Sequence, residues 1–158
     1  MSPRRPPPSR GTRAFFRQVA EELPGHLPPA HRSYRTEQWG RFFKLWYGER
    51  KEQHFEVQFL RDGSLEVAFH MEGDAESNAA TGALLESKAA AIRAALGKQA
   101  EFASHGPRWR ALREVWRDGD LRGEEAATEA ASRLAAYVVA LRPLLSATTI
   151  PTAAKAPA

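Results

Sequence analysis

The sequence of 158 residues contains no cysteine. Disulfide bonds, thiolate catalysis and cysteine-ligated zinc or iron–sulfur sites are therefore excluded together. The sequence also lacks any apolar run near the ~20 residues that cross a bilayer. Its charged, proline-rich start has no apolar run behind it, so we expect no secretory signal. These absences predict a cytoplasmic protein without a membrane-spanning segment.

Common catalytic and nucleotide-binding motifs are absent as well. There is no GxxxxGK[ST] phosphate loop, no GxGxxG after an expected strand, no GxSxG elbow and no HExxH zinc motif. A restriction-type nuclease needs an acidic residue, one spacer and a lysine on a strand to position a metal and a water. Glu56-Val57-Gln58 lacks the lysine, and Glu86-Ser87-Lys88 lies within an expected helix. We therefore predict no catalytic residue and no cofactor.

The basic excess belongs to the two ends of the chain. Residues 1–13 contain Arg4, Arg5, Arg10 and Arg13 and no acid, whereas residues 146–158 contain Lys155 and no acid. Removing these five positive charges from the net charge of +4 leaves −1 for residues 14–145. A domain that grips a phosphate backbone usually shows its charge on one face. The distribution favours a basic arm over a basic globular surface.

Both ends also lack the apolar content that offsets the entropy cost of ordering a chain. Residues 1–11 are rich in proline and arginine, and residues 146–158 in small residues and proline. We therefore predict a disordered basic tail over residues 1–11, one domain over residues 12–145 and a disordered tail over residues 146–158.

Hydrophobic periodicity within the domain predicts three helices and five strands. Residues 108–117 fit a helical stripe as well as a strand, and their flanking turn residues favour the strand. The expected helices are Thr12–Leu23, Asp74–Leu96 and Glu124–Leu145, and the expected strands are Arg41–Tyr47, His54–Leu60, Leu65–Met71, Gln99–Ala103 and 108–117. This order predicts an α+β fold in which an antiparallel sheet begins with a three-stranded meander and the helices pack mainly on one face.

The hairpin around Asp62-Gly63 has a register that its apolar faces restrict. A two-residue loop would set Phe59 opposite Glu66 and so mix the core and solvent faces. An odd-length loop with Gly63 at positive φ keeps the faces separate. It predicts the pairs Phe59–Val67, Val57–Phe69 and Phe55–Met71.

The same register gathers histidines and carboxylates on the polar face of the sheet. It pairs Glu56 with His70 and His54 with Glu72. Such a set could bind a metal or perform acid–base chemistry, but cross-strand charge pairs on a solvated face also explain it. Because neighbouring rungs hold side chains about 5 Å apart, we predict charge pairs and no metal. The candidate residues of this face are Lys44, Trp46, His54, Glu56, His70 and Glu72.

A second candidate is the segment 108–117, in which arginines alternate with tryptophans. This composition suits contacts with phosphates and stacking on bases, but tryptophans also anchor cores beneath the aliphatic parts of arginines. With the arginines of the arm, the predicted nucleic-acid contacts are Arg4, Arg5, Arg10, Arg13, Arg108, Trp109, Arg110, Arg113 and Arg117.

One motif points to a family. The last part of the expected helix Asp74–Leu96 has the pattern L-x-x-[KR]-x-x-x-I-x-x-x-L-G. The pattern runs from Leu85 through Lys88, Ile92 and Leu96 to Gly97. With the meander before it and more sheet and a helix after it, this pattern resembles a bacterial domain family of unknown function that is often appended to restriction-type endonucleases. The resemblance covers about residues 38–145. It implies an accessory or recognition role near DNA-processing systems, and it supplies no catalytic residues.

Three functions fit these observations. The first is a non-enzymatic accessory or protein-interaction domain, associated with a DNA-processing or defence system, that binds a partner or itself. The second is a nucleic-acid-binding protein that uses the arm and residues 108–117. The third is a metal-dependent hydrolase on the His/Glu sheet face. An open face with aromatic and charged residues favours the first, whereas a deep pocket there favours an enzyme.

Overall fold

The computed structural model describes residues 8–147. The parts of the two predicted tails at residues 1–7 and 148–158 lie outside this range. The helices are α1 (Pro8–His26), α2 (Ala75–Ser87), α3 (Ala89–Leu96) and α4 (Glu124–Ala147), with a 3-10 turn at Pro29–His31. The strands are β1 (Arg35–Trp39), β2 (Phe42–Trp46), β3 (Gln53–Phe59), β4 (Leu65–Met71), β5 (Glu101–Ser104) and β6 (Arg110–Trp116).

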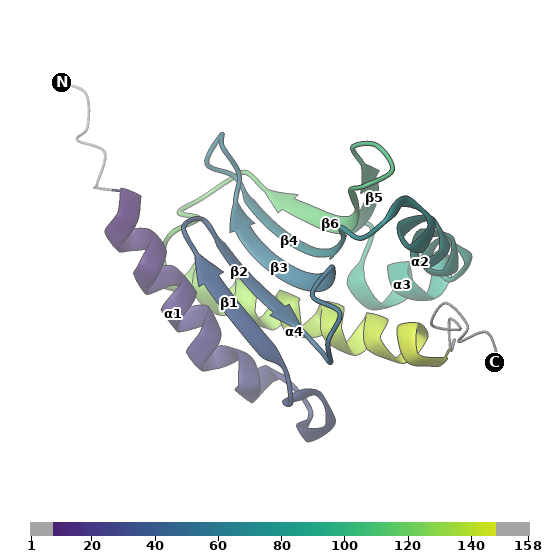
Figure 1. Cartoon of the computed structure of the whole chain (residues 1–158). Coiled ribbons are helices and arrows are strands. Elements are labelled where there is room, and N and C mark those ends of the chain that lie inside the picture. The colour runs from purple at the N-terminus through teal and green to yellow at the C-terminus, as the bar shows by residue number, and fades with distance from the viewer. Residues whose placement is uncertain (1–7, 148–158) are drawn as a thin grey trace.

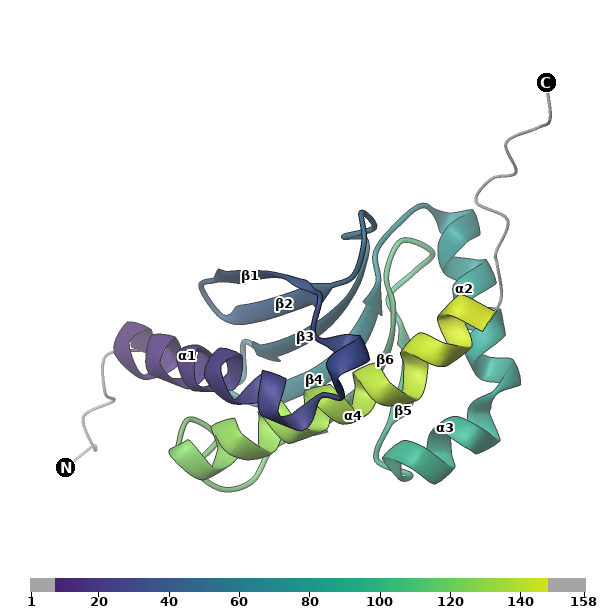
Figure 2. The ribbon, with the colours of Figure 1, turned by 90° about the horizontal axis from the view of Figure 1, so that it is seen from below.

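The six strands form one sheet in the order β1-β2-β3-β4-β6-β5, and every neighbouring pair is antiparallel. Helices α1 and α4 lie together on one face of this sheet, and α2 and α3 stand at one end of it (Figures 1 and 2). The predicted α+β class and the predicted packing of the helices are therefore confirmed. No helix within residues 8–147 is both long and apolar enough to cross a bilayer.

The core forms between this helix pair and the sheet. Helix α1 buries Phe15, Phe16 and Val19 because these positions share one face of a 3.6-residue period. The rings of Phe15 and Phe16 lie 4.9 Å and 5.7 Å from the ring of Phe59 on β3. Helix α4 buries residues at helical spacing, with Ala130, Leu134 and Val138 in the core.

The hairpin between β3 and β4 confirms the predicted separation of faces but not the predicted pairs. Residues 60–64 connect the strands, Gly63 has φ +88°, and the observed pairs are Phe59–Leu65, Val57–Val67 and Phe55–Phe69. The register therefore differs by two residues on β4. The Asp62 carboxylate accepts hydrogen bonds from both the amide and the hydroxyl of Ser64, which closes a tight turn and lets β4 begin at Leu65. A shift of two residues leaves each side chain on its face.

Strand β1 was not predicted, so the meander contains four strands. Its sequence RTEQW has no apolar alternation, and four of its five residues are exposed. The strand forms as a hairpin with β2, in which Trp39 pairs with Phe42 and Gly40 adopts φ +52° at the turn. Position at the edge of the sheet explains why an unpatterned sequence can be a strand.

Other boundaries differ from the predictions. Helix α1 begins at Pro8, so residues 8–11, predicted as tail, are helical. The helix predicted over Asp74–Leu96 is two helices, because Lys88 leaves the helical conformation with φ −108° and ψ 17°. Strand β5 begins at Glu101, two residues after the predicted start. Residues 108–117 contain strand β6, which confirms the strand interpretation.

Candidate functional site

Alternate residues of the strands form the sheet face that is opposite α1 and α4, which we call the open face. In Figure 1 this face is turned towards the viewer, with α4 behind the sheet. Strand pairing arranges its residues in rows across the strands. The rows are Trp39–Phe42–Gln58–Glu66–Val115, then Glu37–Lys44–Glu56–Ala68–Arg113–Glu101, then Arg35–Trp46 on β1 and β2 with His54–His70–Ala111–Ala103 on the other strands.

Polar residues at the centre of this face are buried although no helix of residues 8–147 lies over them. His54, Glu56, Glu66 and His70 are each at most 3% exposed. Long neighbouring side chains contribute to this burial. Lys44 Nζ lies 3.8 Å from Glu56 Oε1, Arg113 Nη1 donates to Glu66 Oε2 at 2.8 Å, and the Trp109 ring lies 5.3 Å from the His70 ring. We call His54, Glu56, Glu66, His70 and Glu72 the polar cluster.

The polar cluster differs from the predicted arrangement in its pairing. His54 pairs with His70 rather than with Glu72, and Glu56 pairs with Ala68 rather than with His70. On the other side of β3, Lys44 of β2 pairs with Glu56. The functional atoms are not held apart in parallel rungs, because His54, Glu56 and His70 each place one ligand atom within 4.8 Å of the others. The premise that these side chains are separated is therefore wrong.

Glu66 is a member of the polar cluster that the sequence interpretation missed. Its Oε1 lies 2.6 Å from His70 Nε2 and accepts a hydrogen bond from Gln58 at 2.8 Å. Burial by itself would raise the pKa of Glu66, but the hydrogen bond and charge of His70, with Arg113 and Gln58, outweigh burial and lower the pKa to about 2. The period of two along β4 places Glu66 on the face of His70, which is the signal that could have identified it.

His70 carries the complementary shift. Burial would lower its pKa, but the hydrogen bonds to Glu66 and Glu72 and the charge of Glu56 outweigh burial and raise the pKa to about 9. The hydrogen bond to His70 also lowers the pKa of Glu72. Without other ligands, the imidazolium of His70 therefore joins the carboxylates that surround it.

The ion pair between His70 and Glu66 predicts how the free energy of unfolding depends on pH in metal-free buffer. The contribution of His70 is complete below its ordinary pKa of 6.5 and is lost as the pH rises through about 9. The contribution of Glu66 is complete above 4.5 and is lost as the pH falls through about 2. We expect the free energy of unfolding, measured by urea denaturation with EDTA present, to be largest between about pH 4.5 and pH 6.5.

The variant His70→Gln provides the control for this profile. It keeps a polar side chain that cannot titrate, so the fall in stability between neutral pH and pH 9 should become smaller. An unchanged fall in this variant would show that another group causes it.

Strand β6 divides the predicted Arg/Trp segment between two faces. Arg113 lies on the open face bound to Glu66, whereas Arg110 pairs with Met71 in the row that faces the helices. Trp116 also faces the helix side and donates to Glu114 Oε2 at 2.7 Å. Arg108 and Arg117 are exposed at the two ends, and Arg117 lies 3.5 Å from Asp62. The structure does not bring these residues together as one basic surface.

The arm arginines lie apart from that segment. Arg13 is exposed on α1 and Arg10 lies in the first turn of the same helix, whereas Arg4 and Arg5 lie outside the described residues. The nucleic-acid surface therefore stays a prediction for these residues.

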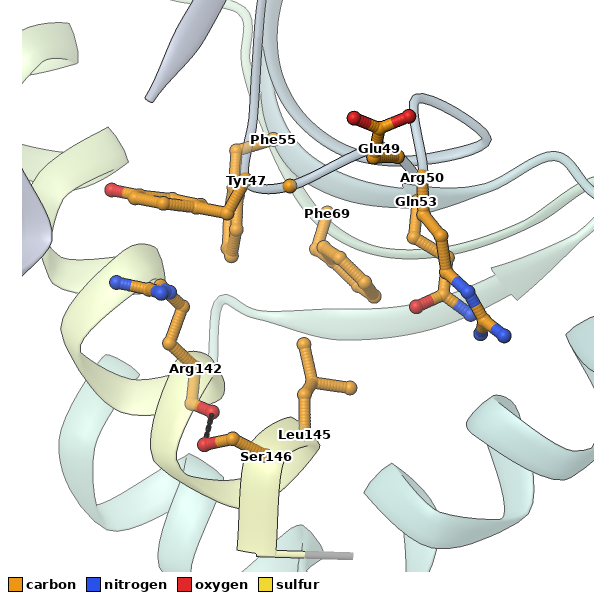
Figure 3. Close-up of a pocket in the computed structure, with 10 residues that line it drawn as sticks. Tyr47, Glu49, Arg50, Gln53, Phe55, Phe69, Arg142, Leu145 and Ser146 are labelled. Atoms are coloured by element: carbon orange, nitrogen blue, oxygen red, sulfur yellow. Dashed lines mark hydrogen bonds between the residues drawn. The ribbon is translucent and has the colours of Figure 1, made fainter. Parts of the chain in front are cut away.

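A pocket of about 320 Å³ lies between the β2–β3 connection and the end of α4 (Figure 3). The side chains of Phe55, Phe69 and Leu145 line its apolar part (Figure 3). Arg142 stands at one side, with its guanidinium 3.7 Å from the centre of the Tyr47 ring and Nη1 2.9 Å from His31 Nδ1. The polar groups at this side are therefore already engaged with each other.

The hydroxyl of Tyr47 is also bound within the protein. Burial raises its pKa to about 12, and its hydroxyl donates to the backbone oxygen of His31 at 2.6 Å. The phenol thus anchors the turn Pro29–His31 to the sheet and is not an acid–base group at neutral pH. The pocket offers apolar surface, whereas the reactive side chains gather in the polar cluster.

Comparisons with known proteins find no relative of this chain. No protein-family model matches the sequence, and searches of curated proteins and of solved structures give no match. The resemblance to the family that accompanies restriction-type endonucleases therefore stays a prediction, and the proposals below depend on the geometry.

Proposed function

We propose that this protein is a non-enzymatic protein-interaction domain that associates through its edge strand β1. The observation that carries the proposal is the exposure of this edge. Strand β1 pairs with β2 alone among the described strands, and Trp39 at its end is 73% exposed. A large exposed aromatic residue beside an unpaired strand edge is typical of a contact surface.

An edge strand binds by strand addition. Its outward amide and carbonyl groups can form a second ladder with an extended segment of a partner, and side chains on the two faces supply specificity. Trp39 lies on the open face, where it can cover apolar surface of an added strand. This mode requires no catalytic residue, in agreement with the absence of catalytic motifs from the sequence.

The sequence of β1 favours a second copy of the chain as the partner that pairs with this edge. If two β1 strands pair antiparallel about Thr36, each Arg35 lies opposite Glu37 of the other copy. This register therefore places opposite charges across the interface twice, and opposite charges in cross-strand pairs stabilise a ladder. A two-fold pair of this kind is closed and self-complementary.

The burial of the polar cluster supports a binding function over a hydrolase. Catalytic metal sites keep one coordination position accessible to water or substrate. In the polar cluster the side chains of His54, Glu56 and His70 are at most 4% exposed. A substrate would have to displace Lys44 or Trp109 to reach them.

An accessory role in a DNA-processing or defence system is a further part of the proposal that depends on the family resemblance alone.

Charge reversal tests the proposed pairing. We expect the wild-type chain to sediment as a dimer in equilibrium ultracentrifugation, and Arg35→Glu or Glu37→Arg to sediment as monomers because each creates like charges across the ladder. An equimolar mixture of the two variants should form dimers again, since Glu at 35 in one chain then faces Arg at 37 in the other.

Lys98→Glu is the matched control, because it makes the same charge change as Arg35→Glu at an exposed residue that lies before β5, at the opposite end of the strand order from β1. It should leave the dimer unchanged. A wild-type chain that stays monomeric up to its solubility limit contradicts the proposed occupant, and so does a mixture of the variants that stays monomeric.

A further inference from the structure

His54, Glu56 and His70 place ligand atoms within 4.8 Å of one another at the centre of the open face, and Glu72 lies beside the two histidines. His54 Nε2 lies 3.5 Å from Glu56 Oε1 and 3.9 Å from Glu72 Oε1. His70 Nδ1 lies 3.2 Å from Glu56 Oε2 and 3.1 Å from Glu72 Oε1. Ligands about 2.0–2.1 Å from a tetrahedral zinc ion are about 3.3 Å from one another. The four nitrogen–oxygen separations, 3.1–3.9 Å, lie near this value, with Glu56 offering Oε1 to His54 and Oε2 to His70.

His54 gives the clearest sign of an absent ligand. Its Nδ1 lies 2.8 Å from the backbone oxygen of Lys51, which only accepts, so Nδ1 carries the hydrogen. In the neutral ring the lone pair is then on Nε2. This atom is buried and makes no hydrogen bond with any residue of 8–147, although it faces Glu56 and Glu72. Buried polar atoms almost always have a partner, and a cation between this nitrogen and the two carboxylates would supply the one that His54 lacks.

The second imidazole is oriented by the contacts that metal ligands usually have. His70 Nε2 lies 2.6 Å from Glu66 Oε1, and Gln58 and Arg113 hold that carboxylate in place. A carboxylate on the far nitrogen of a histidine fixes the ring and strengthens the other nitrogen as a ligand. Lys51 supplies the equivalent backbone contact to His54. Both imidazoles therefore have an outer partner on one nitrogen and face the same point with the other.

We propose that His54 Nε2, His70 Nδ1, Glu56 and Glu72 bind one divalent transition-metal ion of the Zn²⁺ class. Two imidazoles and two carboxylates suit Zn²⁺ and its neighbours, whereas Mg²⁺ and Ca²⁺ take oxygen ligands. On binding, the ion takes the place of the proton between His70 Nδ1 and the carboxylates, and that proton leaves to solvent. No electron transfer is involved.

The site is a structural one. Its four ligands come from the protein, and three of them are buried while the side chain of Glu72 is 33% exposed. Structural zinc sites are closed in this way. Glu72, at the end of β4, is the ligand at which the ion can enter from solvent. The ion would tie β3 to β4 and to the residue that leads into α2.

This inference does not depend on the proposed function, because ligands on β3 and β4 lie away from the β1 edge. Sedimentation tests the edge, and the metal titration tests the site. Either can fail while the other holds.

Titration of the full chain with ZnCl₂ after removal of metals by EDTA and dialysis tests the site. Isothermal calorimetry should give one ion per chain with submicromolar affinity, and MgCl₂ should give no such binding. His54→Ala should weaken Zn²⁺ binding at least about 100-fold, because it removes a ligand that no neighbour can replace. CoCl₂ should produce the visible absorption of four-coordinate Co²⁺ in the wild type and not in this variant.

Glu72→Gln guards against misfolding, since the side chain of Glu72 is 33% exposed and lies outside the hydrophobic core. This variant should still unfold cooperatively in metal-free buffer, with only a small fall in melting temperature from the lost ion pair with His70, and lose at least about tenfold in Zn²⁺ affinity. His105→Ala is the matched control, because His105 is exposed and its ring lies 4.7 Å from the Trp109 ring, outside the proposed ligand set. It should bind as the wild type does. A wild type that takes up no Zn²⁺ overturns the proposal, and so does binding that persists in both His54→Ala and Glu72→Gln.

Discussion

Replacing Phe59 with alanine should lower the free energy of unfolding by about 3–5 kcal/mol. Phe59 is 1% exposed, and its ring packs against Phe15 and Phe16 of α1. The substitution removes apolar contacts and leaves a cavity at the junction of α1 and the sheet, where a long helix cannot collapse inwards without losing its contact with α4. Urea denaturation followed by circular dichroism measures the change.

Phe102→Ala is the matched control for this truncation. Phe102 lies on the edge strand β5 and is 37% exposed, so its ring loses less water contact on folding. We expect it to cost less than half as much as Phe59→Ala. Equal losses at the two positions would mean that Phe59 does not lie at the centre of the core.

The elements that the sequence predicts well are those with a buried face. Strands β3 and β4 alternate apolar and polar residues, and α4 repeats its apolar residues at helical spacing, so their patterns reflect the packing directly. Strand β1 carries no such pattern, because its order comes from pairing with β2 and not from burial of its side chains. An edge strand of this kind is invisible to periodicity.

The register of the β3–β4 hairpin shows where sequence information ends. The apolar pattern separates even from odd shifts, and it excluded the pairing of Phe59 with Glu66. It cannot separate two shifts that differ by two residues, because both leave every side chain on its face. The turn decides between them, through the hydrogen bonds that Asp62 accepts from Ser64.

The candidate site was predictable in membership but not in shape. Alternation placed His54, Glu56 and His70 on one face, and the structure confirms that they share it. Their convergence depends on side-chain rotamers and on outer contacts such as the backbone oxygen of Lys51. None of these contacts has a signature in the order of residues.

A buried network on the other face of β6 was also not predicted. Glu114 is 4% exposed and faces α4. Its Oε1 accepts from Arg133 Nε at 3.1 Å and from the Tyr137 hydroxyl at 3.0 Å, and its Oε2 accepts from Trp116 Nε1 at 2.7 Å. Burial and the charge of Glu114 raise the pKa of Tyr137 above its usual value, so its phenol remains a donor. The network joins α4 to the sheet through one carboxylate.

Replacing Glu114 with alanine should therefore cost about 3–5 kcal/mol of unfolding free energy, because the Tyr137 and Trp116 donors lose their acceptor and the partly buried Arg133 keeps only the backbone oxygen of Leu96 among the acceptors in residues 8–147. Tyr137→Phe removes one donor and leaves no charge unpaired, so it should cost only about 1–2 kcal/mol. The double variant separates the two effects. Since the Tyr137 hydroxyl has lost its acceptor in Glu114→Ala, the second substitution should add little or restore some stability. Additive losses in this cycle, measured by urea denaturation, would show that the carboxylate and the phenol act independently.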